Sequence, residues 1–260
     1  MAAGTYLDRI LQHHRARAAA DDRSLDDLLS EARSCVPPRG FAKSISGTPH
    51  LAVIAEIKRR SPSKGDLNTA LDPAVMARTY RSGGASCLSV LTDEPHFGGS
   101  VADLRAARAA CDLPVLRKDF TVDARDICDA RIMGADCVLL IAAALSPAEL
   151  TEFLSIARHV DIDALVEVHD EAELAVALDA GAVLVGVNQR DLVTFRVDHA
   201  RAVRMGAAMP DSVVKVAESG VRGRDDALSL RAAGYHAVLV GEHLVTAADP
   251  AAALTELCVD

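Results

Sequence analysis

The sequence predicts an α/β protein, a (β/α)8 barrel preceded by an N-terminal helical extension. Three observations indicate this fold: eight apolar, β-branched runs recur along the chain, a helix-like segment follows each run, and glycine with a small residue repeatedly leads into the next one. Such alternation is typical of a parallel sheet covered by helices. The length of 260 residues suits two small domains or one barrel, and eight units favour the barrel.

The first 46 residues differ from the rest because they show helical apolar spacing without an intervening strand. Segments 6–20 and 24–33 have this spacing, and "CVPPRG" at 35–40 ends it. We therefore divide the chain into a helical extension at 1–46, which packs on the barrel, and a catalytic barrel domain at 47–260. His13 and His14 are expected on a solvated face of the first helix.

Eight strands are expected from residue 51 onward. The alternative, an open doubly wound sheet, usually has a glycine-rich dinucleotide turn after its first strand, and "IKRRSPSKG" at 57–65 is not such a turn. Each expected strand is followed by a helix-like segment. The strands cover 51–58, 86–92, 114–120, 136–142, 164–169, 182–188, 212–219 and 237–242.

The overall charge and the cysteine pattern exclude several classes of function. A net charge of −9 argues against a nucleic-acid or membrane-surface partner, which would need a basic face. No apolar run approaches the roughly 20 residues of a membrane span, and the N-terminus lacks a signal-peptide core, so we expect a cytoplasmic protein. The six cysteines form no C-x-x-C pair and the nine histidines no metal-binding pattern, so neither disulfides nor a metal site is expected.

Charged and polar residues gather at the ends of the expected strands. In a barrel these ends and the loops after them form the active site. Side chains alternate with period two, so Glu56 and Lys58 share a face, as do Asn188 and Arg190. Structural ion pairs at the rim are the alternative, but burying so many charges in one place is costly unless they are paired or bind a ligand. The strand-end residues are Glu56, Lys58, Lys118, Asp119, Glu167, Asn188, Arg190, Glu218 and Ser219.

Two glycine-containing loops late in the chain predict a phosphate site. "ESGVRGR" at 218–224 follows the seventh strand and "GEHL" at 241–244 follows the eighth. Gly220 and Gly241 leave backbone N–H groups free to face a ligand, and the seventh and eighth units are the usual phosphate site of this fold. Glycines that merely end strands are the alternative. The sequence thus predicts a phosphorylated small-molecule substrate.

The motifs together resemble the indole-3-glycerol phosphate synthase family of tryptophan biosynthesis, over almost the whole chain. They occur in the expected order, each on its strand or loop. The quoted motifs are "AEIKRRSPSKG" at 55, "FGGS" at 97, "PVLRKDF" at 114, "LLIAAAL" at 139, "LVEVH" at 165, "GVNQRDL" at 186, "VAESGV" at 216 and "LVGE" at 239.

The resemblance implies a lyase without metal or organic cofactor. Known members convert 1-(2-carboxyphenylamino)-1-deoxyribulose 5-phosphate into indole-3-glycerol phosphate, carbon dioxide and water. It implies that Lys118 is the general acid of ring closure and Glu167 the acid/base group for dehydration, held by neighbours that include Glu56 and Asn188. Lys58 would assist closure or the later loss of water. Which lysine acts in which step stays open.

The resemblance also implies the substrate contacts. Ser61 and Arg190 would bind the anthranilate carboxylate, and an aromatic wall would flank the ring. Ordinary barrel packing is the alternative for that wall, most of all for Leu139. The wall comprises Phe97, Phe120 and Leu139, and the phosphate end comprises Ser219, Gly220, Gly241 and Glu242, next to Glu218.

Three positions call for separate interpretation. Gln189 and His243 depart from the usual family pattern, and His243 borders the expected phosphate loop. His169 follows the fifth strand and is interpreted as structural rather than catalytic. We expect a monomer, while the sequence leaves an oligomer open.

Two rival functions fit a barrel with these residues. In a barrel isomerase or Schiff-base aldolase, Lys118 would attack a carbonyl as a nucleophile. A noncatalytic phosphosugar-binding barrel would keep the phosphate loops but could dispense with Lys118 or Glu167, and both residues are present.

Overall fold

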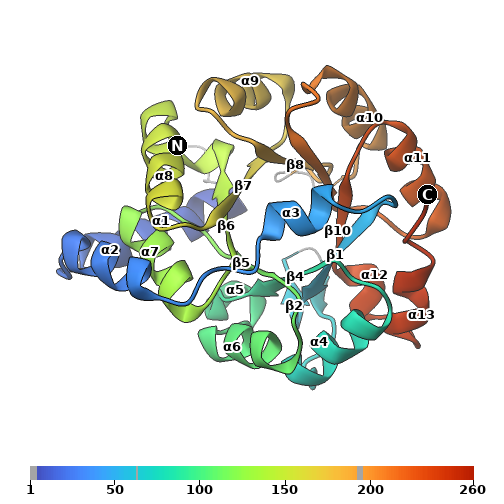
Figure 1. Cartoon of the computed structure of the whole chain (residues 1–260), viewed down its shortest axis with the longest axis horizontal. Coiled ribbons are helices and arrows are strands. Elements are labelled where there is room, and N and C mark those ends of the chain that lie inside the picture. The colour runs from blue at the N-terminus through green and yellow to red at the C-terminus, as the bar shows by residue number, and fades with distance from the viewer. Residues whose placement is uncertain (1–4, 63, 192–195) are drawn as a thin grey trace.

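A computed structural model describes residues 5–62, 64–191 and 196–260. Eight parallel strands form a closed barrel in the order β1-β10-β9-β8-β7-β6-β5-β4, with β4 pairing back to β1, and helices surround it (Figure 1). The predicted fold class, a TIM barrel, is therefore confirmed. The strands are β1 (Ala52–Ile57), β4 (Cys87–Leu91), β5 (Val115–Lys118), β6 (Cys137–Ile141), β7 (Asp163–Val168), β8 (Leu184–Asn188), β9 (Val214–Glu218) and β10 (Ala237–Val240).

A short antiparallel pair in the loop after β1 escaped prediction. It joins β2 (Arg60–Ser61) to β3 (Gly65–Asp66). Two-residue strands leave no periodic signal, so the sequence showed only a polar loop. The pair folds the loop back at the mouth of the barrel, where Ser61 lines the cavity described below. Ser63 and Leu192, which belong to two quoted motifs, lie outside the described residues.

Helices cover the outer face of the barrel. Several begin after an aspartate or serine whose side chain accepts a hydrogen bond from a backbone N–H of the first turn, which satisfies a donor that the helix leaves unpaired. No helix among the described residues is long and apolar enough to cross a membrane. After β1 the helical segments are α4 (Pro73–Ser82), α5 (Glu94–Phe97), α6 (Val101–Ala110), α7 (Ala124–Met133), η1 (Ala142–Ala144), α8 (Pro147–His159), α9 (Glu171–Asp179), α10 (His199–Ala208), α11 (Arg224–Ala232), α12 (Glu242–Val245) and α13 (Pro250–Thr255).

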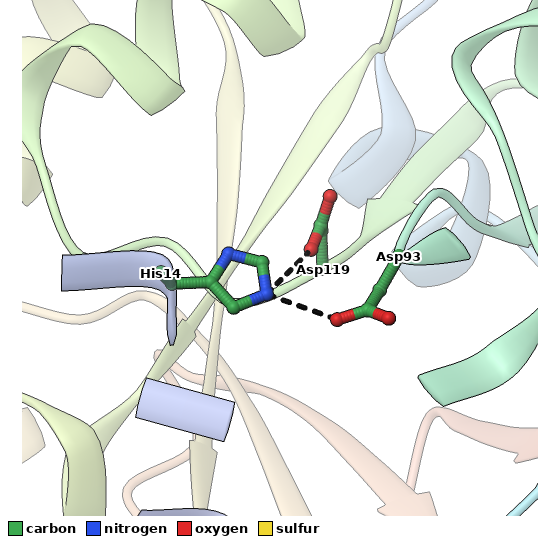
Figure 2. A group of neighbouring side chains, drawn as sticks. All are labelled: His14, Asp93 and Asp119. Atoms are coloured by element: carbon green, nitrogen blue, oxygen red, sulfur yellow. Dashed lines mark hydrogen bonds and ion pairs between the residues drawn. The ribbon is translucent and has the colours of Figure 1, made fainter. Parts of the chain in front are cut away.

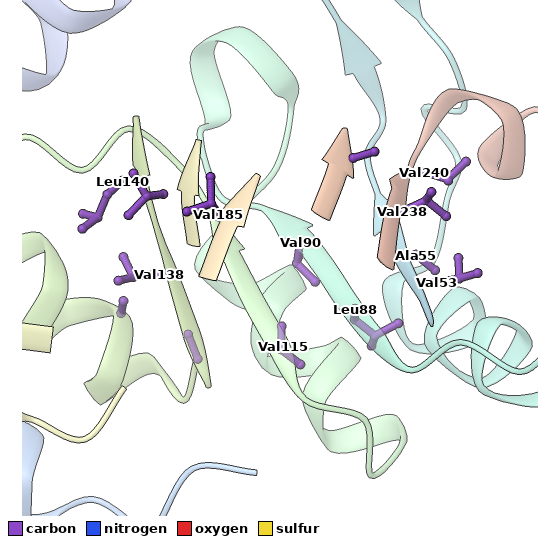
Figure 3. Packing of buried hydrophobic residues seen from close by; sticks show 14 of the residues in the cluster. Val53, Ala55, Leu88, Val90, Val115, Val138, Leu140, Val185, Val238 and Val240 are labelled. Carbon is purple, nitrogen blue, oxygen red and sulfur yellow. The ribbon is translucent and has the colours of Figure 1, made fainter. Parts of the chain in front are cut away.

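Strand alternation divides the apolar residues into two cores. Val53 and Ala55 of β1 belong to the outer core between strands and helices, as do Val138 and Leu140 of β6 (Figure 3). The residues between them face the barrel interior, where Ile54 belongs to a separate inner core. A strand buried on both faces needs apolar residues at successive positions, which explains the near-continuous apolar runs in the sequence.

Three helices precede β1: α1 (Tyr6–Ala19), α2 (Leu25–Ser34) and α3 (Phe41–Ser46). The first two were predicted, and α3 was not. Phe41 and Ile45 of α3 are fully buried in the inner core, and the Ala42 N–H donates to Asp163 at the start of β7. The helix therefore closes the N-terminal end of the barrel. Six residues are too few to show a helical period, which is why its sequence gave no signal.

The prediction for His14 was wrong, whereas His13 is exposed as expected. Only 2% of His14 is exposed. The helix period places His14 four residues after the buried Ile10 on the same face of α1, and that face packs on the barrel.

Candidate active site

A cavity of about 540 Å³ opens at the C-terminal ends of the strands. Every residue that the sequence analysis assigned to the site lines it. The structure therefore brings the predicted set together at one mouth. These residues are Glu56, Lys58, Ser61, Phe97, Lys118, Phe120, Leu139, Glu167, Asn188, Arg190, Glu218, Ser219, Gly220, Gly241 and Glu242.

Strand geometry puts the charged residues inside the barrel. Leu116 and Leu165 belong to the inner core, and the side chain two residues later on each strand faces the same way. Those side chains are Lys118 on β5 and Glu167 on β7. The interior is thus apolar below and charged at its C-terminal layer, where the cavity begins.

Lys118 lies at the centre of the charged layer. Its Nζ donates to Glu167 Oε2 at 2.9 Å and lies 3.6 Å from Glu218 Oε2. Burial lowers the pKa of Lys118, but the charges of Glu167, Glu218 and Glu56 outweigh burial and raise that pKa above its ordinary value. Lys118 is therefore an ammonium group at neutral pH.

Glu167 is held as a carboxylate. Its other oxygen, Oε1, accepts from Asn188 Nδ2 at 3.1 Å and lies 3.4 Å from His169 Nε2. Burial raises the pKa of Glu167, but Lys118, His169 and Asn188 outweigh it and lower that pKa. Burial lowers the pKa of His169, yet its contacts with Glu167 and Glu173 raise it to about 10. His169 is therefore a cation next to Glu167 Oε1.

Glu218 has the opposite electrostatic balance. It is 2% exposed, and its Oε1 has no hydrogen-bond partner among the described residues. Burial, followed by the charge of Glu167, raises the pKa of Glu218 to about 8 despite the nearby Lys118. Gly186 on β8 makes room for this side chain, since a Cβ there would lie 2.1 Å from Glu218 Oε1. The protonated form of Glu218 is therefore favoured at neutral pH.

Glu56 and Lys58 on and after β1 form an ion pair through Oε1 and Nζ, as their shared face predicted. Glu56 Oε2 lies 3.5 Å from Ser89 Oγ. Among the described contacts, Asn188 bonds to Glu167 as expected, but Glu56 is paired with Lys58 instead. A Cβ at Gly241 would lie 2.3 Å from Glu56 Oε1, so glycine at this position leaves room for the pair.

One side of the cavity is aromatic. The rings of Phe97 and Phe120 lie 6.2 Å apart at 38°, and Leu139 lies below them in the inner core. Ser61 Oγ is buried and has no hydrogen-bond partner among the described residues. A ligand oxygen could satisfy this hydroxyl group, and burial without a partner is otherwise costly.

The glycine loops form another part of the cavity lining. Ser219 and Gly220 both have positive φ, +66° and +76°, a conformation that costs a serine of order 1 kcal/mol. A Cβ at Gly220 would lie 2.4 Å from Val197, so the chain is tightly folded here. The Glu242 carboxylate lies 3.6 Å from Lys64 Nζ and 4.0 Å from Arg190 Nη2, so two cations offset its charge beside the loops.

The sequence analysis missed several residues that line the cavity. The signals were present for Leu7 and Ile10, whose apolar spacing required a surface to bury against. Lys64 and Arg222 lie within loops that the sequence analysis quoted but were not assigned to the site, and no local pattern pointed to His199. The missed residues include Tyr6, Leu7, Ile10, Lys64, His199 and Arg222.

Comparison with known sequences gives a consistent result. A family model described as indole-3-glycerol phosphate synthase matches residues 7–257. A relative from Streptomyces coelicolor named indole-3-glycerol phosphate synthase 2 is 51% identical over 248 residues, or 95% of each chain. An indole-3-glycerol phosphate synthase from Mycobacterium avium is 47% identical over 259 residues, which cover 99% of this chain and 95% of that one.

Comparison with solved structures supports the fold. A 3-hexulose-6-phosphate synthase superposes with a TM-score of 0.62 at 18% identity, covering 80% of this chain and 98% of that one. Thiamine phosphate pyrophosphorylase from Pyrococcus furiosus gives a TM-score of 0.59 at 17% identity, covering 83% and 95%. At these identities the likeness concerns the fold alone.

Proposed function

This chain belongs to the indole-3-glycerol phosphate synthase family, and on that premise we propose that Lys118 is the general acid of its reaction. The enzyme is a carboxy-lyase of tryptophan biosynthesis. It closes the indole ring of 1-(2-carboxyphenylamino)-1-deoxyribulose 5-phosphate and releases carbon dioxide and water. The placement of the Lys118 ammonium group beside Glu167 and Glu218 in the cavity supports the proposal most directly.

Ring closure is the first step in which Lys118 acts. As the aromatic ring carbon attacks the ketone, negative charge develops on the ketone oxygen, and a proton from Lys118 Nζ converts that oxygen to a hydroxyl group. The raised pKa of Lys118 keeps the donor protonated before the attack. A fixed ammonium in a largely buried site also stabilises the developing charge.

Loss of carbon dioxide then restores the aromatic ring, and dehydration needs a base and an acid. Glu167 is the base in this proposal, because its lowered pKa leaves it ionised and Asn188 orients it. The departing hydroxyl group takes a proton from a neighbouring acid, for which Lys58 and the protonated Glu218 are both in place. Glu56 positions Lys58 through their ion pair.

Two anionic groups on the substrate fit polar groups that line the cavity. Ser61 and Arg190 bind the anthranilate carboxylate, Arg190 through paired N–H donors, while Phe97, Phe120 and Leu139 flank the ring. The backbone of the glycine loops binds the phosphate. The loop residues are Ser219, Gly220, Gly241 and Glu242.

A Schiff-base mechanism is the rival for Lys118. Such a mechanism needs a neutral amine as nucleophile, and the three surrounding carboxyl groups raise the pKa of Lys118 and favour its protonated form. Borohydride added with substrate would trap a lysine adduct in an aldolase. We expect no adduct on Lys118.

Several broader features also remain proposals. We infer that residues 1–46 form an extension and residues 47–260 the barrel domain, although α3 within the extension fills the end of the barrel. We further propose that the protein acts in the cytoplasm as a monomer on a phosphorylated small molecule, without a nucleic-acid partner. The net charge of −9 supports the last point.

The absence of tryptophan provides a direct assay, because indole fluorescence rises over a nearly silent protein background. Lys118→Ala should reduce the initial rate by roughly 10²-fold or more. Circular dichroism of the same sample checks that the variant is folded. A folded variant with a rate close to wild type would remove Lys118 from the mechanism.

A further inference from the structure

Helix α1 forms one wall of the cavity although it is remote in sequence from the barrel strands. Tyr6, Leu7 and Ile10 all line the cavity, and Ile10 is 1% exposed. A helix outside the barrel has no sheet hydrogen bonds to fix it, so side-chain contacts must hold it in place. His14, one turn beyond Ile10, is in position to do so.

His14 reaches two carboxylates at the barrel mouth (Figure 2). Its Nε2 lies 2.9 Å from Asp93 Oδ2 and 3.9 Å from Asp119 Oδ1. Asp93 follows β4 and begins α5, and Asp119 directly follows β5. All three side chains are nearly inaccessible. The group therefore joins α1 to two neighbouring strand ends.

The same imidazole ring also touches the aromatic wall. Its centroid lies 5.4 Å from that of Phe120 at a tilt of 44°, and Phe120 in turn packs against Phe97. Asp119, Phe97 and Phe120 line the cavity. A displacement of His14 would thus reach the part of the cavity where the proposed function places the anthranilate ring.

The charge of Asp93 fixes the direction of the hydrogen bond. Burial raises the pKa of Asp93, but hydrogen bonds from His14 and His96 outweigh burial and lower it to about 2. An ionised carboxylate can only accept, so His14 Nε2 carries the hydrogen and donates it. Loss of His14 would leave this buried carboxylate with His96 as its donor, through the backbone N–H and Nδ1.

A histidine and two aspartates are also the residue types that bind metal ions. Here, however, the carboxylates already have other partners. Asp119 Oδ2 accepts from Arg117 and Thr92, and the His96 backbone N–H donates to Asp93 Oδ1. The contacts describe a hydrogen-bonded anchor with a balancing guanidinium group.

We propose that His14 is a positioning residue that fixes α1 over the cavity, so that Leu7 and Ile10 complete the substrate-binding wall beside Phe120. This role of His14 rests on the proposed function only for the identity of the ligand. Lys118 and Glu167 belong to barrel strands, not to α1. Loss of the anchor should therefore weaken substrate binding more than it slows the chemical steps.

Kinetics of four variants test the proposal. His14→Ala removes the donor and the ring, and should raise KM by about tenfold or more, the effect of losing a hydrogen bond to a buried charge, with kcat within about threefold of wild type. His14→Gln keeps a donor near the position of Nε2 and should restore most of the affinity. His14→Phe keeps the ring without the donor, so it should resemble His14→Ala. His13→Ala changes the exposed neighbour on the same helix and should behave like wild type.

Hydrogen exchange of the unliganded proteins provides a test that does not depend on the reaction. In His14→Ala, amides of residues 6–19 should exchange at least about tenfold faster, while those of β5 and β7 stay protected, because only α1 opens locally. If His14→Ala does not fold, the comparison of His14→Phe with His14→Gln takes its place.

Unchanged α1 exchange in the variants without the donor, or an unchanged KM, would overturn the proposal. Equal loosening of the whole barrel would also overturn it, because His14 would then support only the fold. If the wild-type protein made no indole product, the proposed function would fail while the exchange test of the anchor still stood.

Discussion

Both ends of the barrel contain buried carboxyl groups, but the hydrogen bonding of these groups differs between the two ends. At the closed N-terminal end, Asp136 is fully buried and accepts from the backbone N–H groups of Arg39 and Val115 and from the Arg108 guanidinium group. At the open end, Glu218 is equally buried but keeps one oxygen without a hydrogen-bond partner among the described residues. Glu218 lines the cavity at the open end.

This difference separates charges that stabilise the fold from charges that are available for chemistry. At the closed end the Asp136 carboxylate bonds only to donors of the fold, whereas Glu167 at the open end lines the cavity although both of its oxygens also accept hydrogen bonds. At the open end Glu167 and Glu218 both lie next to the Lys118 ammonium group, and the pKa of Glu218 is raised while that of Glu167 is lowered. Pairs of groups with pKa values moved apart are the usual basis of acid and base assignments.

Substitution at the open end should produce the largest effect on activity. Glu167→Gln keeps the size of the side chain, but it replaces one of the two acceptor oxygens that bond to Lys118 and Asn188 by an NH2 donor. The substitution removes the base, so kcat should fall by roughly 10²-fold to 10⁴-fold while the variant stays folded at the assay temperature. Steady-state indole fluorescence and a thermal melt measure the two quantities. A rate near wild type would show that the open end does not depend on this carboxylate.

Substitution at the closed end should show the reverse pattern. Asp136→Ala leaves the Arg108 charge and two backbone N–H groups without their partner, and should lower the free energy of unfolding by about 3–5 kcal/mol while kcat of the folded enzyme stays near wild type. Urea unfolding measures the loss. Asp112→Ala is the matched control, since its ion pair with Arg81 is exposed. Equal unfolding midpoints for the two variants would contradict the comparison.

The smallest effect concerns the pH dependence of stability. The raised pKa of Glu218 means that the folded protein keeps a proton that the unfolded chain releases between pH 4.5 and about 8. The contribution of this group to stability is therefore greatest below pH 4.5 and is lost as the pH rises through that window. Glu218→Gln should flatten this decline.

Urea unfolding of both proteins at several pH values between 5 and 8.5 measures the difference in slope. Other groups that titrate in this range, His169 among them, contribute to both proteins and cancel in the comparison. Parallel pH profiles would mean that Glu218 is ionised in the folded state.

Local periodicity made most of the fold and most of the site predictable. A strand buried on both faces shows itself as an apolar run, and the run's end marks the mouth of the barrel. Period two then places Glu56 with Lys58, and Asn188 with Arg190, on shared faces. The place of the two glycine loops in the cavity lining was predictable because loops of the seventh and eighth units lie at the mouth of this fold.

The sequence by itself determined the barrel, its polar mouth and the residues that meet there. Only the tertiary structure decided that α3 fills the closed end, that His14 is buried against Asp93, and that the pKa of Glu218 is raised. The physical reason is that periodicity reports which face of an element is buried, not what it is buried against. His14 and Asp93 are 79 positions apart, and the pKa of Glu218 depends on charges contributed by three other strands.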